Sequence, residues 1–363
     1  MALNEQALTA ALQTVIDPNT GKDFVSTKAL KNLQINGGDV SFDVVLGYPA
    51  KSQIAGFRKE LIAAAKSVAG VDNVSANITM NIVAHAAQRG VALLPQVKNI
   101  IAVASGKGGV GKSTTAANLA LALAAEGASV GLLDADIYGP SQPMMMGIEG
   151  RPESSDGQTM DPLENYGVQV MSIGFLVDQD EAMIWRGPMA TQALEQLLRQ
   201  TNWKSLDYLI VDMPPGTGDI QLTLSQRVPM TGAVIVTTPQ DIALLDAKKG
   251  IKMFEKVGVP ILGLVENMAV HVCTNCGHVE HIFGADGGKK MAEQYEMDYL
   301  GALPLNMQIR LQADNGKPTV VADPDGEVAA IYKAVARQVA VKIAAKAKDF
   351  SAKFPSIKIS KDT

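Results

Sequence analysis

The sequence predicts an α/β protein: a mostly parallel sheet, covered by helices on both faces, follows a small α+β domain. From residue 99 onward, short runs rich in Val, Ile and Leu alternate with helical patterns, as in sheets whose parallel strands are buried on both faces. Before that point, apolar residues form a hairpin pattern flanked by helical patterns. The expected divisions of the chain are a first domain at 1–87, a linker at 88–98, a second domain at 99–348 and a polar, lysine-bearing tail at 349–363.

The composition is that of a globular protein with a substantial core. Hydrophobic residues make up 47% of the 363 residues, charged residues make up 19%, and the formal net charge is −5. This acidic balance offers no general attraction for nucleic acid or an anionic membrane. No apolar run approaches the length of about 18 residues that spans a bilayer, and the N-terminus lacks a secretion signal. With two cysteines there is no disulfide scaffold, so we expect a cytoplasmic protein without nucleic-acid or membrane partners.

The first domain has the pattern of a small mixed fold. We expect a helix over 5–16, two hairpin strands around the turn at 36–38, a second helix over 52–68 and a last strand over 74–82. The domain contains no cysteine, and its acidic residues fall in turns. These features favour a docking role over a chemical one.

The second domain alternates strand and helix patterns along its whole length. In such sheets, ligands gather beyond the carboxyl ends of the strands. The expected strands are 100–104, 130–133, 168–172, 208–211, 233–237 and 261–266, and the expected helices are 114–125, 189–200, 244–257 and 326–347.

A glycine-rich loop after the first strand of this domain carries the strongest chemical signal. Residues 105–115 read SGKGGVGKSTT, and the segment 106–113 fits the pattern GxxxxGK followed by Ser or Thr. In that pattern, backbone N–H groups surround phosphate oxygens, the lysine supplies a positive charge and the hydroxyl ligates Mg²⁺. The helix that follows directs its positive end at the same anion. The sequence therefore predicts a nucleoside triphosphate site with contacts from Gly106, Lys107, Gly108, Gly109, Val110, Gly111, Lys112, Ser113 and Thr114.

Acidic residues end two of the expected strands. Asp134 and Asp136 follow one apolar run, and their i, i+2 spacing places both carboxylates on one side of it. Asp212 ends another run and enters the loop MPPGTGD. One aspartate at such a place is more often a helix cap, but two behind a phosphate loop favour phosphoryl chemistry. We expect Asp134 and Asp212 in the Mg²⁺ shell, Asp136 to position the attacking water, and Gly216 to donate its N–H to the γ-phosphate.

The early lysine of the loop makes the resemblance to a known family specific. Lys107, followed by GGVGKS, resembles the deviant phosphate-loop motif of the MinD/ParA group of dimerising ATPases. In that group the early lysine reaches the nucleotide of the partner subunit. The resemblance therefore implies a homodimer in which Lys107 and Lys112 both serve ATP hydrolysis. It also implies that Asn267, after the strand at 261–266, binds the adenine, and that residues 237–240 shape the base pocket.

Within that group, the chain resembles the Mrp/ApbC-type iron–sulfur cluster carrier proteins. The resemblance rests on the loop at 103–114, LDADIYGPS at 133–141, DMPPGTGD at 212–219 and VENM at 265–268. The first domain is similar to a small domain often fused to bacterial members. The resemblance implies an ATPase that holds a [4Fe–4S] cluster at a dimer interface and transfers it to apo-proteins, with scaffold proteins as further partners. The extra N-terminal cysteine cluster of some relatives is missing, which argues against a second permanent cluster.

Cys273 and Cys276 form a CxxC motif beside three histidines. From the residues alone, three interpretations remain open. Two such loops facing each other across a dimer axis would supply four thiolates for a [4Fe–4S] cluster. A Cys₂His₂ zinc site with His278 and His281 would need an unusually short spacing, and a redox dithiol belongs before a helix in a thioredoxin-like unit. The family resemblance favours the cluster. We interpret His271 and His281 as polar loop residues and keep His278 as a candidate auxiliary ligand.

The principal alternative is a positioning or partitioning ATPase switch that acts on DNA or a membrane, with structural zinc at the CxxC motif. Such proteins carry an amphipathic membrane helix or a basic surface. Here the closing helix at 326–347 is rich in Ala and Val, and the net charge is acidic. A third interpretation makes the first domain the partner-binding adaptor, regulated by the ATPase half.

The run Met144–Met146 is expected on a dimer face.

Overall fold

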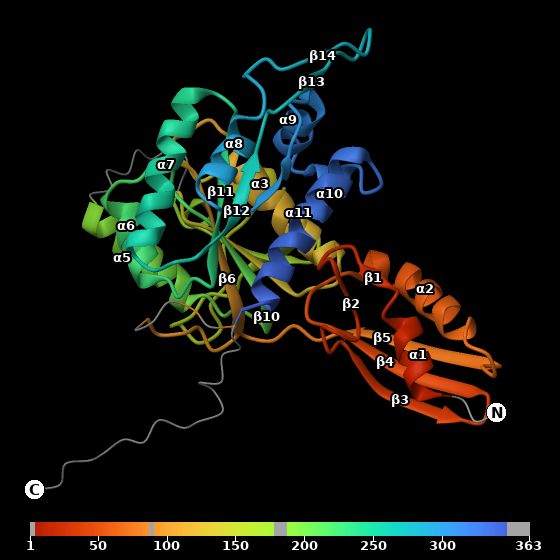
Figure 1. Cartoon of the computed structure of the whole chain (residues 1–363). Coiled ribbons are helices and arrows are strands. Elements are labelled where there is room, and N and C mark those ends of the chain that lie inside the picture. Colours follow the sequence, from red (N-terminus) through yellow and green to blue (C-terminus); the bar gives the residue numbers. More distant parts are fainter. Residues whose placement is uncertain (1–3, 86, 88–90, 178–186, 347–363) are drawn as a thin grey trace, which may run out of the picture.

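A computed structural model describes residues 4–85, 87, 91–177 and 187–346 of the chain. It contains a small N-terminal domain and a larger domain built around a sheet (Figure 1). The predicted tail at 349–363 and part of the predicted linker at 88–98 lie outside the described residues. Among the described residues, no helix is long and apolar enough to cross a membrane.

Eight strands form the sheet of the larger domain, in the order β15-β12-β11-β6-β10-β7-β9-β8. Every neighbouring pair is parallel except β8 with β9, so the predicted mostly parallel sheet is confirmed. The central strands are buried on both faces, which explains their unbroken apolar runs. The strands are β6 (Val97–Ala104), β7 (Val130–Asp134), β8 (Leu163–Asn165), β9 (Val168–Ser172), β10 (Leu206–Asp212), β11 (Gly232–Thr237), β12 (Ile261–Glu266) and β15 (Tyr299–Ala302).

Helices cover both faces of this sheet. Figure 1 shows α5, α6 and α7 on one side and α3 and α11 on the other. For α3 and for α5 to α7, this division follows from right-handed crossovers, because the chain moves in one direction across the sheet after β6 and in the other direction after β9. The helices are α3 (Lys112–Ala125), α4 (Gln142–Met145), α5 (Gly187–Gln200), α6 (Asp219–Arg227), α7 (Asp241–Lys256), α8 (Gly287–Gln294), α9 (Met307–Asp314), α10 (Thr319–Ala322) and α11 (Glu327–Ala344), with a 3₁₀ turn at Ile173–Phe175.

The small domain packs two helices on a three-stranded sheet, as predicted. Alternate residues of its central strand are buried, so one face of the sheet meets the helices and the other meets solvent. The first helix ends at Leu12 instead of 16, because the β-branched residues that follow disfavour a helix and the chain pairs in a short ribbon. The elements are α1 (Glu5–Leu12), β1 (Ile16–Asp17), β2 (Lys22–Asp23), β3 (Leu30–Asn36), β4 (Asp39–Leu46), a 3₁₀ turn at Lys51–Gln53, α2 (Ile54–Lys66) and β5 (Asn73–Met80).

The two domains meet at the C-terminal end of α3, around the buried carboxylate of Glu126. Ser52 of the small domain donates its backbone N–H and its hydroxyl to this carboxylate, at 3.0 Å and 2.7 Å. Arg337 of α11 pairs with the same group. The backbone N–H of Lys51 also donates to the carbonyl of Glu126, at 3.0 Å. The charge inside the junction is therefore paired and hydrogen-bonded from both domains.

Candidate functional site

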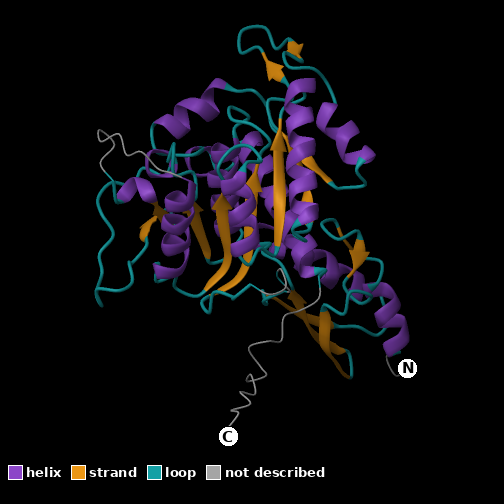
Figure 2. Ribbon diagram, turned by 90° about the vertical axis from the view of Figure 1, so that its left-hand side faces the viewer, coloured by secondary structure: helices purple, strands orange, loops and turns teal. Residues whose placement is uncertain are grey.

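The order of the strands brings the predicted nucleotide residues to one edge of the sheet. Strand β10 lies between β6 and β7, and Asp212 at its end is in register with Val103 of β6 and Asp134 of β7. The glycine-rich loop begins directly after β6. The parallel strands point toward the same side of the molecule in Figure 2, so this loop and both acids meet beyond their carboxyl ends.

Glycines are required at three positions of the loop. Gly109 and Gly111 adopt φ values of 80° and 79°, in the left-handed region that favours glycine. At Gly106, an added Cβ would lie 2.0 Å from the backbone carbon of Asp246 in α7. Gly106 therefore allows α7 to pack against the start of the loop, and the other two glycines shape the turn that ends where α3 begins, at Lys112.

Lys112 forms a buried ion pair with Asp212, and its Nζ lies 3.0 Å from the hydroxyl of Ser113. The lysine is 6% exposed and the aspartate 0%. The carboxylate of Asp212, at the end of β10, thus neutralises the charge of the loop's lysine. A phosphate group would take the lysine from this carboxylate, which would then be free to face a cation.

Asp134 is a buried carboxylate held by several donors. Its oxygens accept hydrogen bonds from the backbone of Gln142 at 3.0 Å and from the hydroxyl of Ser172 at 3.1 Å. Burial raises the pKa of Asp134 to about 7, and the neighbouring charge of Asp212 adds to the rise. Burial also raises the pKa of Asp136, while Lys112 opposes that rise. The structure therefore brings all three predicted acids together around the lysine.

The donor atoms at this edge suit a hydrated Mg²⁺ ion. Asp134, Asp212 and the hydroxyl of Ser113 are the oxygen ligands that this ion prefers. In addition, the hydroxyl of Ser141 and the carboxamide oxygen of Gln142 are buried here without a hydrogen-bond partner among the described residues. Buried polar atoms are nearly always paired, so these two atoms fit a site that receives a hydrated ion.

Asn267 and Gly216 lie at the loop but hold other partners in this structure. The Asn267 amide donates to the carbonyl of Val110 at 2.8 Å. The N–H of Gly216 donates to the carbonyl of Ser105 at 3.0 Å. Each would have to release this bond to contact adenine or the γ-phosphate, so both roles remain predictions.

The ammonium group of Lys107 is different. Within the part of the chain that the structure describes, it has no ion-pair or hydrogen-bond partner. Its side chain is half-buried. An unpaired cation at this position is consistent with a target outside its own chain, as the sequence predicts. The methionine run is only partly exposed: Met144 is 63% exposed, but Met146 is buried in the core and is unsuited to a dimer face.

The CxxC motif lies at the tip of a short hairpin that projects from the body of the larger domain (Figure 1). Its strands are β13 (His271–Val272) and β14 (Val279–Glu280). Cys276 is exposed, and the thiol of Cys273 is partly exposed. Hydrogen bonds from the backbone of Cys276 and Asn275 lower the pKa of the Cys273 thiol. A lowered pKa favours the thiolate, which is the form that binds metal.

The histidines near the hairpin do not complete a metal site within one chain. His281 Nδ1 lies 2.9 Å from the carbonyl of Ala269, and His278 Nε2 lies 3.7 Å from a carboxylate oxygen of Glu280. The described residues contain no group of three or more His, Cys, Asp or Glu side chains arranged to hold a metal ion. The four ligands of a Cys₂His₂ zinc site are therefore not together in this structure.

Comparison with known proteins decides the family. A family model described as NUBPL iron-transfer P-loop NTPase matches residues 96–340, and one described as iron-sulfur cluster assembly protein matches residues 5–78. The chain belongs to the iron-transfer P-loop NTPase family. This membership confirms the family resemblance that the sequence motifs predict. It also agrees with the nucleotide-binding fold of the larger domain. The second match covers the small domain.

The similarity to individual relatives extends over most of the chain. An iron-sulfur cluster carrier protein of Escherichia coli K12 is 51% identical over 327 residues, which cover 90% of this chain and 89% of that protein. The mouse iron-sulfur cluster transfer protein NUBPL is 57% identical over 245 residues, 67% of this chain and 77% of that protein.

Solved structures agree on the fold. A nucleotide-binding protein from Archaeoglobus fulgidus, in complex with ADP, has a TM-score of 0.56 and 37% identity and covers 64% of this chain and 90% of that one. The cell-division ATPase MinD of Pyrococcus furiosus, at 22% identity and a TM-score of 0.50, covers 66% of this chain and 98% of that one and shares the fold.

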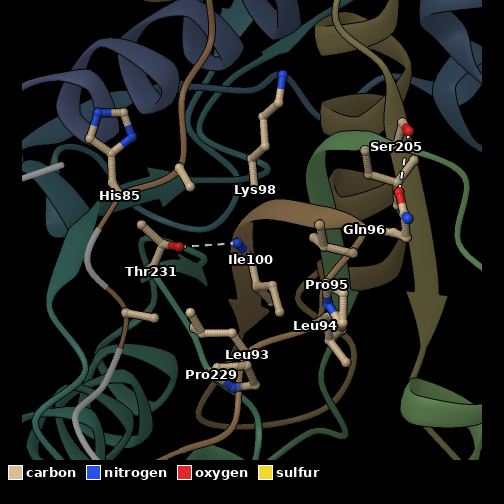
Figure 3. A pocket seen from close by; sticks show the side chains of 14 residues that line it. His85, Leu93, Leu94, Pro95, Gln96, Lys98, Ile100, Ser205, Pro229 and Thr231 are labelled. Atoms are coloured by element: carbon tan, nitrogen blue, oxygen red, sulfur yellow. Dashed lines mark hydrogen bonds between the residues drawn. The ribbon is translucent and has the colours of Figure 1, made fainter. Parts of the chain in front are cut away.

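A cavity lies at the other end of the strands from the phosphate loop. It has a volume of about 400 Å³ and lies near the start of β6, beside Lys98, Ile100 and Thr231. Figure 3 shows these side chains around it, with the Thr231 hydroxyl bonded to the N–H of Ile100 at 3.1 Å. Neither the family's phosphate loop nor the cysteine hairpin lines this cavity, so it lies apart from the chemistry described above.

Proposed function

We propose that this chain is an iron–sulfur cluster carrier in which ATP controls a [4Fe–4S] cluster shared by two copies of the chain. The observation that carries the proposal is the position of Cys273 and Cys276 at the exposed tip of a hairpin, without further ligands from the described part of the chain. Each chain offers two thiolates, and a [4Fe–4S] cluster takes four. A symmetric dimer with facing hairpins would supply them. The names of the relatives, carrier and transfer proteins, support the same cargo.

ATP hydrolysis is the second part of the proposal. Lys112 would leave Asp212 and bind the β- and γ-phosphates, and Asp136 would position the attacking water. Mg²⁺, held by the acids of the site and the Ser113 hydroxyl, would neutralise negative charge on the transferred phosphoryl group. Lys107 would reach the nucleotide of the partner subunit, so that hydrolysis requires the dimer.

The partners follow from the cargo. Apo-proteins with free cluster ligands would receive the cluster, and scaffold proteins would supply it. The match of the small domain to cluster assembly proteins supports a docking role for that domain. Its position at the far end of α3 leaves the cysteine hairpin clear for a client (Figure 1).

Anaerobic reconstitution with iron and sulfide tests the proposal. About four iron and four sulfide per dimer are expected, because four thiolates hold one cluster. Either Cys273→Ala or Cys276→Ala leaves two thiolates per dimer, so iron loading should collapse while ATP binding and the fold persist. Thr274→Ala, in the same exposed loop, is the matched control and should load normally.

Metal content and transfer separate the alternatives. One tightly held zinc per chain, after reconstitution with iron and sulfide, would contradict the shared cluster. The loaded protein should also restore the activity of an apo-enzyme that needs a [4Fe–4S] cluster. An excess of chelator that blocks this transfer completely would show release of free iron instead of carriage.

A further inference from the structure

Gln142 is a buried residue that forms hydrogen bonds to three parts of the nucleotide site, through its side chain and its backbone N–H. It follows the acidic motif of Asp134 and Asp136, at the start of α4, and is 0% exposed. Its Nε2 donates to Asp212 at 2.8 Å and to the backbone carbonyl of Ser113 at 3.0 Å. Its backbone N–H donates to Asp134 at 3.0 Å. Gln142 therefore fixes the phosphate loop and both acids relative to one another.

The carboxamide oxygen of Gln142 is a buried acceptor without a hydrogen-bond partner among the described residues. Its orientation is determined by its neighbours. Turning the carboxamide over would place its oxygen against a carboxylate and a carbonyl, which are both acceptors, so the nitrogen must face them. In this structure the described residues supply no donor to the oxygen, so a bound group would have to supply one.

The chemistry of the site limits what this donor is. Phosphate oxygens only accept hydrogen bonds from the protein, so they cannot satisfy the Gln142 oxygen. The Lys112 ammonium donates to Asp212 and the Ser113 hydroxyl in this structure, and with a nucleotide bound it would turn to the phosphates. A water molecule on a cation has its lone pair directed at the metal and its hydrogens directed outward. Mg²⁺ keeps several such waters when it binds with a nucleotide.

We propose that Gln142 is a positioning residue for the Mg²⁺ that accompanies the nucleotide. Its oxygen accepts a hydrogen bond from a metal-bound water, and its nitrogen keeps Asp212 turned toward the same ion. The inference rests on the proposed nucleotide function. It adds Gln142, which is neither part of the phosphate loop nor one of the acidic residues, to the nucleotide site.

Calorimetric titration of ATP binding at a series of Mg²⁺ concentrations tests this role. Gln142→Met keeps the length of the side chain and removes the carboxamide. The Mg²⁺ concentration for half-maximal ATP binding should rise roughly tenfold, the effect of losing one hydrogen bond to a charged group, whereas ATP affinity in EDTA should change by less than about twofold. If the parent itself does not bind ATP, the proposed function fails, and if it binds ATP without regard to Mg²⁺, this inference alone is overturned.

Two further variants complete the test. Gln169→Leu is the matched control, because Gln169 is 9% exposed and its carboxamide bonds to the backbone of Lys204 at 3.1 Å and 2.9 Å, outside the nucleotide site. It should leave the Mg²⁺ requirement unchanged. Gln142→Leu also removes the carboxamide, with a shorter apolar side chain, and should raise the Mg²⁺ requirement by a similar factor.

The inference is overturned if folded Gln142→Met shows the parent's Mg²⁺ requirement. It is equally overturned if ATP affinity falls by the same factor with Mg²⁺ and in EDTA, which would indicate a purely structural role. If Gln142→Met does not fold, Gln142→Leu decides, because the parent's Mg²⁺ requirement in that variant contradicts a role for the carboxamide.

Discussion

Arg337 neutralises a carboxylate inside the domain junction, and its removal gives a large expected loss of stability. Glu126 is 1% exposed and Arg337 is 14% exposed, so the pair is shielded from solvent. Arg337→Met keeps an aliphatic side chain but leaves the Glu126 charge buried without a cation. Breaking one side of a buried ion pair costs about 3–5 kcal/mol. Since Ser52 still donates two hydrogen bonds to the carboxylate, we expect a value near the lower end.

Urea unfolding of the full chain measures this loss, with an exposed ion pair as the control. Arg310 and Asp314 are 63% and 50% exposed, so Arg310→Met should cost less than about 1 kcal/mol. Adding Glu126→Gln to Arg337→Met should recover part of the loss, because the amide brings no charge that needs neutralisation. If Arg337→Met costs no more than Arg310→Met, the reasoning about the junction is wrong.

Three further predictions concern the nucleotide site. Lys112→Ala should abolish ATP binding, whereas Lys107→Ala should bind ATP and lose hydrolysis; hydrolysis at the parent rate would contradict its action in trans. Burial raises the pKa of Asp134 from 3.8 to about 7, so the folded protein retains a proton that the unfolded chain releases between these values. The melting temperature of the parent, relative to that of Asp134→Asn, should therefore fall as the pH rises from about 4 to about 7. A constant difference between the two melting temperatures over this range would contradict a buried, protonated Asp134. Gly106→Ala places a methyl group 2.0 Å from the α7 backbone and should lower both stability and ATP affinity, unlike Gly139→Ala, where the added carbon meets nothing within 4 Å.

The sequence predicts best the elements whose pattern comes from burial on both sides. The strand predicted at 261–266 coincides with β12, because each of its apolar residues faces a packed layer. Helix α8 was not predicted, since it begins with two glycines, which are poor helix formers. This helix begins at its two glycines because of contacts with the rest of the fold. A Cβ on Gly288 would lie 2.7 Å from the carboxylate of Glu266, and the N–H of Gly288 donates to that carboxylate.

The same distinction applies to the site. The phosphate loop is a contiguous motif whose glycines and lysines act at fixed spacing, so its position can be predicted from local sequence. Gln142 bonds to Asp212 across 70 residues, and Arg337 bonds to Glu126 across 211 residues. Neither pair has a local signature, because each forms only when the sheet is assembled. A buried polar residue directly after an acidic motif is the signal that would have singled out Gln142.

A short connection joins the nucleotide loop to the cysteine hairpin, and it suggests how ATP would act on the cluster. Asn267 ends the segment after β12 and holds the Val110 carbonyl of the loop. The hairpin strand begins at His271. Between them, Met268 has φ 56°, a left-handed conformation that is strained for this residue, and Ala269 donates its N–H to the Leu303 carbonyl at 3.0 Å.

If Asn267 exchanges the Val110 carbonyl for adenine, as the family resemblance implies, the base of the hairpin must move with it, because few residues separate the two. We therefore expect ATP to change the rate at which a loaded parent dimer releases iron to a chelator. In Asn267→Ala this response should be lost, although the cluster still loads, because both cysteines are present. Release rates measured at nucleotide concentrations that saturate each protein exclude weaker binding as the cause. An Asn267→Ala dimer that responds to ATP like the parent would show that the signal reaches the cysteines by another route.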